Sequence, residues 1–395
     1  MLINELPDDC LMAIFEYVND LDDLINCYKV CVGWSYLIAE RTKKAKYLLE
    51  DPWQTDDYEH DDEDDSDYSD LFRYPWDCVF YRGRNPIDVT CLNTLFPNLT
   101  ILEFTYRLEN KMKRSEIVSF VRNHESLKGI IDENGYPVSE YCNKLEMTST
   151  YSDELSKIQN ASNIKQLYTG NFSVEDVKKY AHDFPNLELL RTSINMKGKN
   201  KGSRVSVFEK LKILILYSDD QKGFHGFHLM DLCPNLQSAF ITMECNRFFV
   251  DETVKHECLQ DLVIQFFGDK RINWNDLERL LMKYPNLKHL ALRKPRGMND
   301  EHVEKLIQIL PNLVLLNVEN WPTITKRTVD IVDDYCKRNG RSIKCYVERN
   351  YNEIKSDWPH LSTTNEKISR GFDFMKHCFL KDSFELPHFL VPVDY

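Results

Sequence analysis

Apolar residues recur at helical spacing along the first forty residues of the chain. Offsets of three, four and seven residues predict a helix that buries one stripe of side chains, namely Leu11, Ile14, Phe15 and Val18. Pro7 suits the first helical position, and the two aspartates after it suit the positive end of the helix dipole. A second helix, capped by Asp22 or Asp23, would carry Leu24, Cys27, Tyr28 and Cys31, and a third would carry Trp34, Leu37 and Ile38. Three helices this short bury little surface by themselves, so we expect their apolar groups to meet a partner.

Further along, the hydrophobic pattern repeats. The triplet Pro-Asn-Leu starts at residues 97, 185, 234, 285 and 311, and weaker copies lie between these. The anchor positions are Leu99, Leu127, Leu145, Ile164, Leu187, Leu211, Leu236, Leu259, Leu287, Leu313 and Ile343. Successive anchors are 18 to 30 residues apart, and the two shortest steps, into Leu145 and Ile164, fit the repeat least well. A period of this size indicates a stacked array of repeats.

Each repeat contains one strand and one helix. Apolar residues three and five places after an anchor, such as Leu214 and Leu216, alternate as in a short strand. Helix starts are predicted at Ser173, Asn275 and Asp300, each followed by an apolar stripe that ends before a proline. Such units stack into a curved solenoid because none buries its own apolar face. In this pattern residues 71–350 resemble a leucine-rich repeat domain, which implies parallel short strands inside and helices outside.

The N-terminal segment carries a second resemblance. The runs Leu6-Pro7-Asp8-Asp9-Cys10-Leu11, Ile14-Phe15-x-Tyr17-Val18, Asp23-Leu24 and Val30-Cys31-x-x-Trp34 are similar to an F-box over residues 1–48. Cys10 departs from the family, which has a larger aliphatic residue there. The resemblance implies docking on the Skp adaptor of an SCF (Skp–cullin–F-box) ubiquitin ligase. The residues expected to bind the adaptor are Leu6, Pro7, Leu11, Ile14, Phe15, Val18, Leu24, Val30, Cys31 and Trp34.

Acidic residues are concentrated between the two regions. Of the formal net charge of −13, eleven carboxylates lie in residues 51–70 without any lysine or arginine, so the remainder is nearly neutral. Like charges at this density resist collapse, which predicts a disordered linker over residues 49–70. Alternatives are a lure for a basic partner or phosphorylation at Ser66 or Ser69. The nearly neutral remainder offers no basic stripe, which disfavours nucleic-acid binding.

Catalytic and cofactor sites are poorly supported by the sequence. His225, His228 and Cys233 lack a strong zinc spacing, and we expect no metal or other cofactor. The adjacent pair His377 and Cys378 lacks a third orienting group, so we expect no enzymatic activity. Neither a signal peptide nor an apolar run long enough to cross a membrane is evident, and the twelve scattered cysteines read as reduced thiols. These features predict a cytoplasmic or nuclear protein.

The expected target-binding surface is the concave face of the array. Residues between the buried strand leucines point toward that face and form an apolar patch that turns polar further along. The candidates are Leu189, Arg191, Ile213, Ile215, Tyr217, Phe240, Val263, His289 and Arg293. The aromatic-rich residues 351–395 either fold back across this face or cap the last repeat, and their helical part is predicted at residues 365–380.

These observations favour a non-catalytic substrate receptor of an SCF-type ligase. The F-box would hold the adaptor while the repeats hold a protein target near the conjugating enzyme. The alternative is a repeat scaffold that binds the adaptor, or other proteins, without promoting ubiquitylation.

Overall fold

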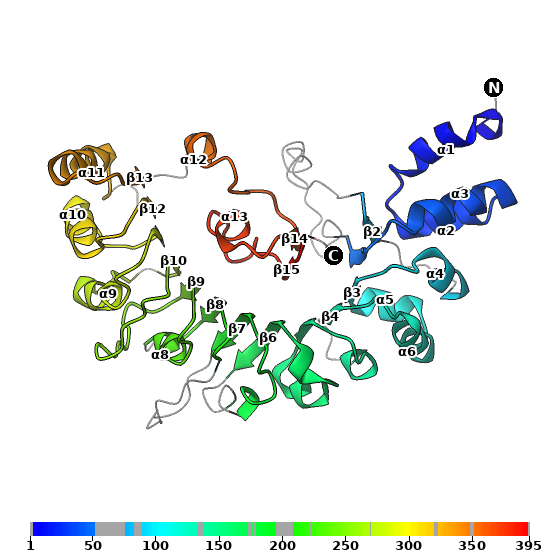
Figure 1. Ribbon diagram of the computed structural model, residues 1–395, viewed down its shortest axis with the longest axis horizontal. Coiled ribbons are helices and arrows are strands. Elements are labelled where there is room, and N and C mark those ends of the chain that lie inside the picture. The colour runs from blue at the N-terminus through cyan, green and yellow to red at the C-terminus, as the bar shows by residue number, and fades with distance from the viewer. Residues whose placement is uncertain are drawn as a thin grey trace. The chain divides into compact units, whose positions relative to one another are not determined.

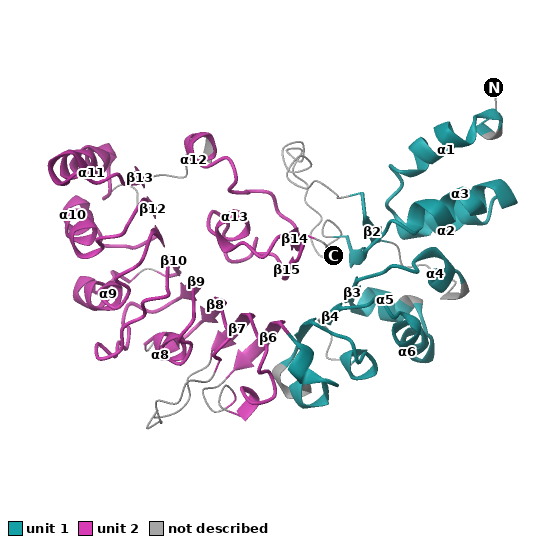
Figure 2. Cartoon of the chain, in the orientation of Figure 1, with its two compact units in different colours: residues 1–164, 395 teal, residues 165–394 magenta. Residues whose placement is uncertain are grey.

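The computed structural model of the protein describes residues 3–51, 76–82, 89–132, 138–172, 176, 179–194, 208–220, 223–268, 270–319, 323–347 and 351–393. The chain forms two compact units, unit 1 over Met1–Ile164 and unit 2 over Lys165–Asp394 (Figure 2). The predicted acidic linker lies largely outside the described residues, as do residues 173–175 at the predicted helix start.

Unit 1 begins with three predicted helices. A 3₁₀ turn at Ile3–Glu5 precedes α1 (Asp8–Phe15), α2 (Leu21–Tyr28) and α3 (Val32–Thr42). Pro7 is the residue before α1, and its fixed φ of −54° suits the entry into a helix. The predicted cap of α2 was wrong. Asp20 is the cap, because its carboxylate accepts a hydrogen bond from the backbone N–H of Asp23, which belongs to the first turn of α2.

The first strand of the array follows these helices almost at once. Leu49 and Glu50, which the sequence placed in the linker, belong to β1 (Tyr47–Glu50). Unit 1 has five described parallel strands in the order β2–β1–β3–β4–β5. The others are β2 (Cys78–Tyr81), β3 (Ile101–Phe104), β4 (Gly129–Asp132) and β5 (Met147–Thr150). Their connections contain α4 (Val89–Leu95), α5 (Tyr106–Lys111), α6 (Arg114–Asn123), η3 (Val138–Tyr141), η4 (Ser152–Lys157) and η5 (Ala161–Asn163).

Unit 2 continues the same alternation of strand and helix (Figure 1). Its parallel strands are β6 (Gln166–Phe172), β7 (Leu189–Ile194), β8 (Ile213–Ser218), β9 (Ser238–Met243), β10 (Asp261–Phe266), β11 (His289–Arg293), β12 (Leu315–Glu319) and β13 (Lys344–Tyr346), paired in chain order. Its outer layer contains α8 (Gly226–Asp231), α9 (Trp274–Leu281), α10 (Asp300–Ile309) and α11 (Lys326–Asn339). Every predicted anchor precedes a strand by one or two residues, which confirms the repeat pattern.

The two shortest repeats are real. The steps into Leu145 and Ile164 contain 3₁₀ turns, η3 in the first and η4 with η5 in the second, where the steps into Leu287 and Leu313 contain α-helices. A 3₁₀ turn covers the strand with fewer residues, which accounts for their length. The step from Leu236 to Leu259 contains no helix, contrary to the predicted pattern of one helix in each repeat. The caps of the later helices differ from prediction: Asn273 and Asn299 cap α9 and α10, one or two residues before the predicted positions.

The recurrent asparagine of the Pro-Asn-Leu triplet ties each repeat to the one before it. The side-chain amides of Asn235, Asn286 and Asn312 donate to backbone carbonyls of Glu209, Glu257 and Pro285, over 2.7 to 3.0 Å. These bonds satisfy carbonyls in the turns that lead into the strands, where the sheet ladder does not reach. Asn98 makes the equivalent bond to the carbonyl of Lys43, directly after α3, over 2.9 Å. The first repeat is therefore joined to the N-terminal helices as if they were a preceding repeat.

The C-terminal segment forms short elements of its own. These are α12 (Tyr351–Asp357), β14 (Ile368–Arg370), α13 (Phe374–His377) and β15 (Phe389–Val391). The predicted helix over residues 365–380 was wrong, because β14 pairs in parallel with β15 and Gly371 has a φ of +108°. That conformation is strained for any residue with a β-carbon and breaks a helix. Only the four residues of α13 are helical within the predicted range.

Candidate functional sites

The apolar residues predicted to contact the adaptor divide into an inner and an outer group. Leu11, Phe15 and Leu24 are buried between the three helices, and the Phe15 ring meets Trp34 edge-on at a centroid distance of 5.0 Å. Leu6, Val18 and Trp34 are partly buried, whereas Pro7, Ile14, Val30 and Cys31 are exposed. The inner group therefore holds the helices together, and only the outer group is open to a partner.

Several exposed apolar residues on the same helices were not predicted. Tyr17 is 89% exposed, Val32 is 87% exposed and Tyr36 is 63% exposed, and Ile3 is also exposed. We call Ile3, Ile14, Tyr17, Val30, Val32 and Tyr36 the N-terminal apolar surface. Helical periodicity marks residues that face a core, so it passes over apolar residues on the opposite side. The sequence signal that could have identified them is a large apolar residue at a helix position where the periodic pattern predicts exposure to solvent.

A buried arginine joins α3 to the segment between α1 and α2, and a strand of unit 1 binds the same segment. Arg41 of α3 is 1% exposed, and its Nη2 donates to the carbonyl of Val18 over 3.5 Å. Burial lowers the pKa of Arg41, and the nearby Glu16 and Asp77 partly oppose this. The N–H of Phe80 in β2 donates to the carbonyl of Asn19, over 2.8 Å. The loop between α1 and α2 is thus held by both a helix and a strand.

In unit 2 the C-terminal segment lies against the inner face of the strands (Figure 1). We call residues 351–393 the tail. The apolar residues of both sides form one buried cluster, made of Leu189, Ile213, Ile215, Phe240, Val263, Ala291, Leu315 and Tyr346 from the strands with Ile354, Leu361, Phe374, Cys378, Phe379, Leu380, Leu386 and Leu390 from the tail. Of the two alternatives for the tail, the structure supports the one that crosses the concave face.

Polar side chains of the strands bind the main chain of the tail. Gln166 donates to the carbonyl of Leu390 over 2.7 Å and accepts from its N–H over 2.9 Å. The guanidinium of Arg191 donates to the carbonyls of Ser383 and Leu386 over 3.2 and 3.0 Å.

Arg293 makes a second set of such bonds. Its guanidinium donates to the carbonyl of Phe379 over 2.6 Å and to that of Lys381. Arg293 is 1% exposed and also lies 3.6 Å from the Asp382 carboxylate. Because a buried guanidinium is costly unless its donors are satisfied, these bonds fix the tail firmly on the strands.

The tail thus accounts for most of the predicted target-binding residues. Leu189, Ile213, Ile215, Phe240 and Val263 are buried in the shared cluster. Arg191 and Arg293 hold the tail, and His289 is bonded to Asp261 over 2.6 Å with Trp358 and Phe379 edge-on to its ring. Tyr217, which is 42% exposed, is the predicted residue that the tail leaves most open.

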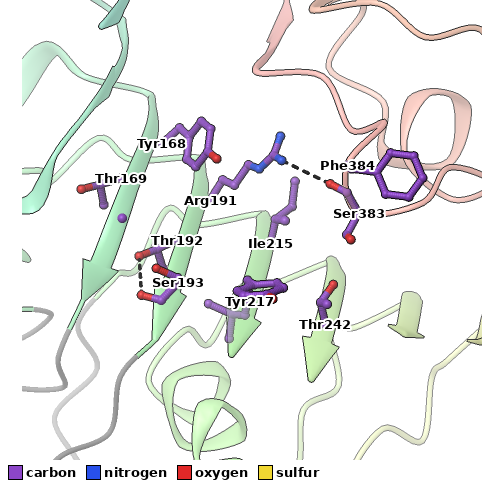
Figure 3. A pocket seen from close by; sticks show the side chains of 12 residues that line it. Tyr168, Thr169, Arg191, Thr192, Ser193, Ile215, Tyr217, Thr242, Ser383 and Phe384 are labelled. Atoms are coloured by element: carbon purple, nitrogen blue, oxygen red, sulfur yellow. Dashed lines mark hydrogen bonds between the residues drawn. The ribbon is translucent and has the colours of Figure 1, made fainter. Parts of the chain in front are cut away.

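A cavity of about 270 Å³ lies beside Tyr217, at the margin of the tail (Figure 3). Strands β6 to β9 supply most of its wall, and the tail supplies the rest. The lining residues are Tyr168, Thr169, Gly170, Arg191, Thr192, Ser193, Ile215, Leu216, Tyr217, Thr242, Ser383 and Phe384. Burial raises the pKa of Tyr217, and the nearby carboxylates Glu244 and Asp219 raise it further, so its phenol is protonated at neutral pH.

His377, the last residue of α13, and Cys378, which follows it, are unsuited to catalysis. Burial raises the pKa of the Cys378 thiol to about 12 and lowers the pKa of His377 to about 4. A thiol in this state is not a nucleophile at neutral pH. Within the described ranges no group of three or more His, Cys, Asp or Glu could hold a metal ion, and no helix there is both long and apolar enough to cross a membrane.

The sequence and fold were compared with known proteins. The pattern of the F-box-like family matches residues 3–42. No curated protein matches the chain. The solved structures that resemble it include the APL1 leucine-rich repeat domain (9% identity, TM-score 0.34, covering 69% of this chain and 74% of that one) and the leucine-rich repeat-containing protein LegL7 from Legionella pneumophila (11%, 0.36, 63% and 85%).

A third is the complex of Rad7 and Elc1 in yeast (13% identity, TM-score 0.38, 70% and 80%). The strand order, the helices and the recurring anchors described above establish the repeat architecture of the chain itself. The chain therefore carries an F-box-like domain at residues 3–42, followed by a leucine-rich repeat array.

Proposed function

We propose that this protein is the substrate receptor of an SCF-type ubiquitin ligase, with its F-box-like domain bound to a Skp-type adaptor. The N-terminal apolar surface is the observation that carries the proposal. Six of the fifteen exposed large apolar residues in the described part of the chain lie between Ile3 and Tyr36. A concentration of this kind on so small a unit is typical of a surface that is covered in a complex.

The mechanism that we propose is proximity. The receptor needs no catalytic residue, because holding a target near a charged conjugating enzyme turns a bimolecular transfer into an effectively intramolecular one. This proximity effect is largest when the adaptor-binding helices are held rigidly by the rest of the receptor. The bonds from Phe80 to Asn19 and from Asn98 to Lys43 attach the helices to the first repeats, which supports this reading for unit 1.

Co-purification of the adaptor tests the docking site. We expect the double variant Tyr17→Ala with Val32→Ala to lose at least 30-fold in adaptor affinity, since a single aromatic anchor such as Tyr17 contributes about 2 kcal/mol or more to a protein interface. The variant Leu6→Ala with Pro7→Ala should act in the same direction. Phe249→Ala removes an aromatic residue that is 43% exposed, in unit 2, and serves as the control. Undiminished adaptor binding in both double variants would refute the assignment.

The alternative, a scaffold that does not present targets, is favoured by one observation: the tail already occupies most of the concave face. The two functions separate in cells that express the wild type or the Tyr17→Ala/Val32→Ala variant. For a receptor, proteins that co-purify with the repeats should lose ubiquitin and accumulate when the adaptor-binding surface is removed. For a scaffold, the same proteins should bind without any change in ubiquitylation or abundance.

A further inference from the structure

The cavity beside Tyr217 is a part of the concave region of unit 2 that the tail leaves open. Arg191 does not make it an anion site, because its guanidinium donates to tail carbonyls and lies over the Tyr168 ring at 4.5 Å. Its N–H donors are therefore directed to the tail, and its positive charge lies on the Tyr168 side of the cavity.

The walls of the cavity suit a single apolar side chain. Tyr168 and Ile215 line it from the strands, and two exposed aromatics, Tyr217 from β8 and Phe384 from the tail, lie near its opening (Figure 3). Phe384 is 76% exposed although the tail around it is anchored on both sides. A volume of about 270 Å³ is below the range of about 300–1,000 Å³ that is usual for drug-sized ligands, so it fits one aromatic ring better than a cofactor.

The charges next to Tyr217 are negative. Asp219 follows β8 directly, Glu244 follows β9 directly, and both act electrostatically on the phenol. Hydroxyl groups of Ser193, Thr242 and Ser383 complete the lining without adding charge. A ligand that places a positive charge beside its apolar group would thus be attracted to this site.

We propose that this cavity receives an aromatic side chain from a linear segment of the protein target, and that lysine or arginine residues flank it. The proposal rests on the proposed function, in which the repeats hold a target. The rings of Phe384 and Tyr217 contact the aromatic ring of the target, while the carboxylates of Asp219 and Glu244 pair with the lysine or arginine residues that flank it. The tail is then part of the receptor surface, since it supplies one of the two aromatic walls.

Binding of short peptides to the full-length protein tests the proposal. The probe is a fluorescein-labelled seven-residue peptide with a central phenylalanine, a lysine on each side, and glycine and serine at the ends, measured by fluorescence anisotropy. We expect saturable binding. Replacing the phenylalanine by alanine should weaken binding at least tenfold, and replacing the lysines by glutamates should weaken it at least fivefold.

Variants of the protein locate the binding. Tyr217→Ala and Phe384→Ala should each weaken binding of the probe at least fivefold, whereas Met282→Ala, an exposed apolar residue at the end of α9, should leave it unchanged. Gly170→Leu fills the cavity from β6, where a β-carbon meets nothing within 4 Å, and should abolish binding without loss of folding. Asp219→Asn with Glu244→Gln should remove the preference for lysine over glutamate.

The results that overturn the proposal are equally specific. The proposal is wrong if the lysine-flanked probe does not bind at concentrations up to about 1 mM, or if the alanine peptide binds equally well. It is also wrong if the glutamate peptide binds more tightly, or if binding survives Tyr217→Ala, Phe384→Ala and Gly170→Leu. The same preparations are assayed for adaptor co-purification. Failure of the peptides with intact adaptor binding rejects this site alone, and loss of adaptor binding in the wild type rejects the proposed function instead.

Discussion

One apolar surface of this protein is exposed to solvent, and another is buried by the tail. The N-terminal apolar surface in unit 1 is left exposed, with Tyr17 and Val32 more than four-fifths accessible, whereas the apolar residues of the concave face in unit 2 are buried by the tail. The N-terminal helices and the concave face were both expected from sequence to bind other proteins, although only Ile14 and Val30 of the N-terminal apolar surface were among the predicted contacts. The difference teaches that an apolar face indicates a binding event but not whether the partner is another molecule or the same chain.

The largest effect is expected from two phenylalanines of the tail that lie five residues apart. Phe379 is fully buried in the shared cluster and Phe384 is mostly exposed. Phe379→Ala should lower the free energy of unfolding by about 3–5 kcal/mol because it leaves a cavity in the core. Phe384→Ala should change it by less than about 0.5 kcal/mol. Urea unfolding and limited proteolysis of the tail measure the effects of both substitutions. Similar losses of unfolding free energy in the two variants would contradict the described packing of the tail on the strands.

Arginine substitutions sharpen the comparison by asking how far the tail depends on polar contacts. Arg293→Ala leaves the carbonyls of Phe379 and Lys381 without their donor, which should cost about 1.5–3 kcal/mol of unfolding free energy. The control is Arg279→Ala, which breaks an exposed pair with Glu252 and should cost less than about 1 kcal/mol. Equal losses measured by urea unfolding would mean that Arg293 does not secure the tail.

Acidification should weaken the tail through His377. Its Nε2 hydrogen-bonds the carbonyl of Arg370 over 2.8 Å, so this nitrogen carries the proton, and Nδ1 is buried without a hydrogen-bond partner among the described residues. A second proton on Nδ1 would be buried without an acceptor, and burial accordingly lowers the pKa in the folded state to about 4. The unfolded chain binds a proton near pH 6.5, so this contribution to stability is present above pH 6.5 and is lost progressively as pH falls toward 4.

The urea midpoint at pH 7.5 and pH 5 measures this loss. His377→Gln can keep the bond to Arg370 but does not titrate, so its midpoint should fall less between the two pH values than that of the wild type. An identical change of the urea midpoint with pH in both proteins would show that His377 does not cause the loss of stability at low pH.

The smallest effect on stability is expected at the exposed surface. Tyr17→Ala and Val32→Ala should each change the free energy of unfolding of the isolated protein by less than about 0.5 kcal/mol, since neither side chain is packed. Thermal or urea unfolding without the adaptor measures this. A loss above about 1 kcal/mol would show that the surface supports the fold of unit 1 and would weaken its reading as a docking site.

The parts that could be predicted from sequence are those with local, periodic signals. All eleven repeat anchors precede strands, and three helices form in the N-terminal segment, because amphipathic spacing reflects which side chains are buried. The first two helices are shorter than predicted: Val18 lies beyond the end of α1, and Cys31 caps α3 and does not belong to α2. Helix starts were displaced by one to three residues, since several neighbouring Asp and Asn residues could each cap a helix and the sequence does not say which one does.

The tail was not predictable in the same way. Phe372, Met375 and Phe379 have helical spacing, but their neighbours are organised by the pairing of β14 with β15 and by contacts with strands more than 80 residues away in sequence. Nor could the sequence reveal the cavity, which forms only where Phe384 of the tail comes to lie near Tyr217. Non-local pairing overrides local periodicity in both cases.

The hydrogen bonds between strands and tail have an evolutionary consequence. Gln166, Arg191 and Arg293 bind main-chain groups of the tail: carbonyls, which every amino acid presents, and one N–H, which every amino acid except proline presents. Substitutions at tail positions between its buried apolar residues should therefore be tolerated, and the tail should stay bound to the strands. Phe384 is one such position, so a lineage could exchange this residue, and with it the kind of target side chain that is preferred, while the repeat array stays the same.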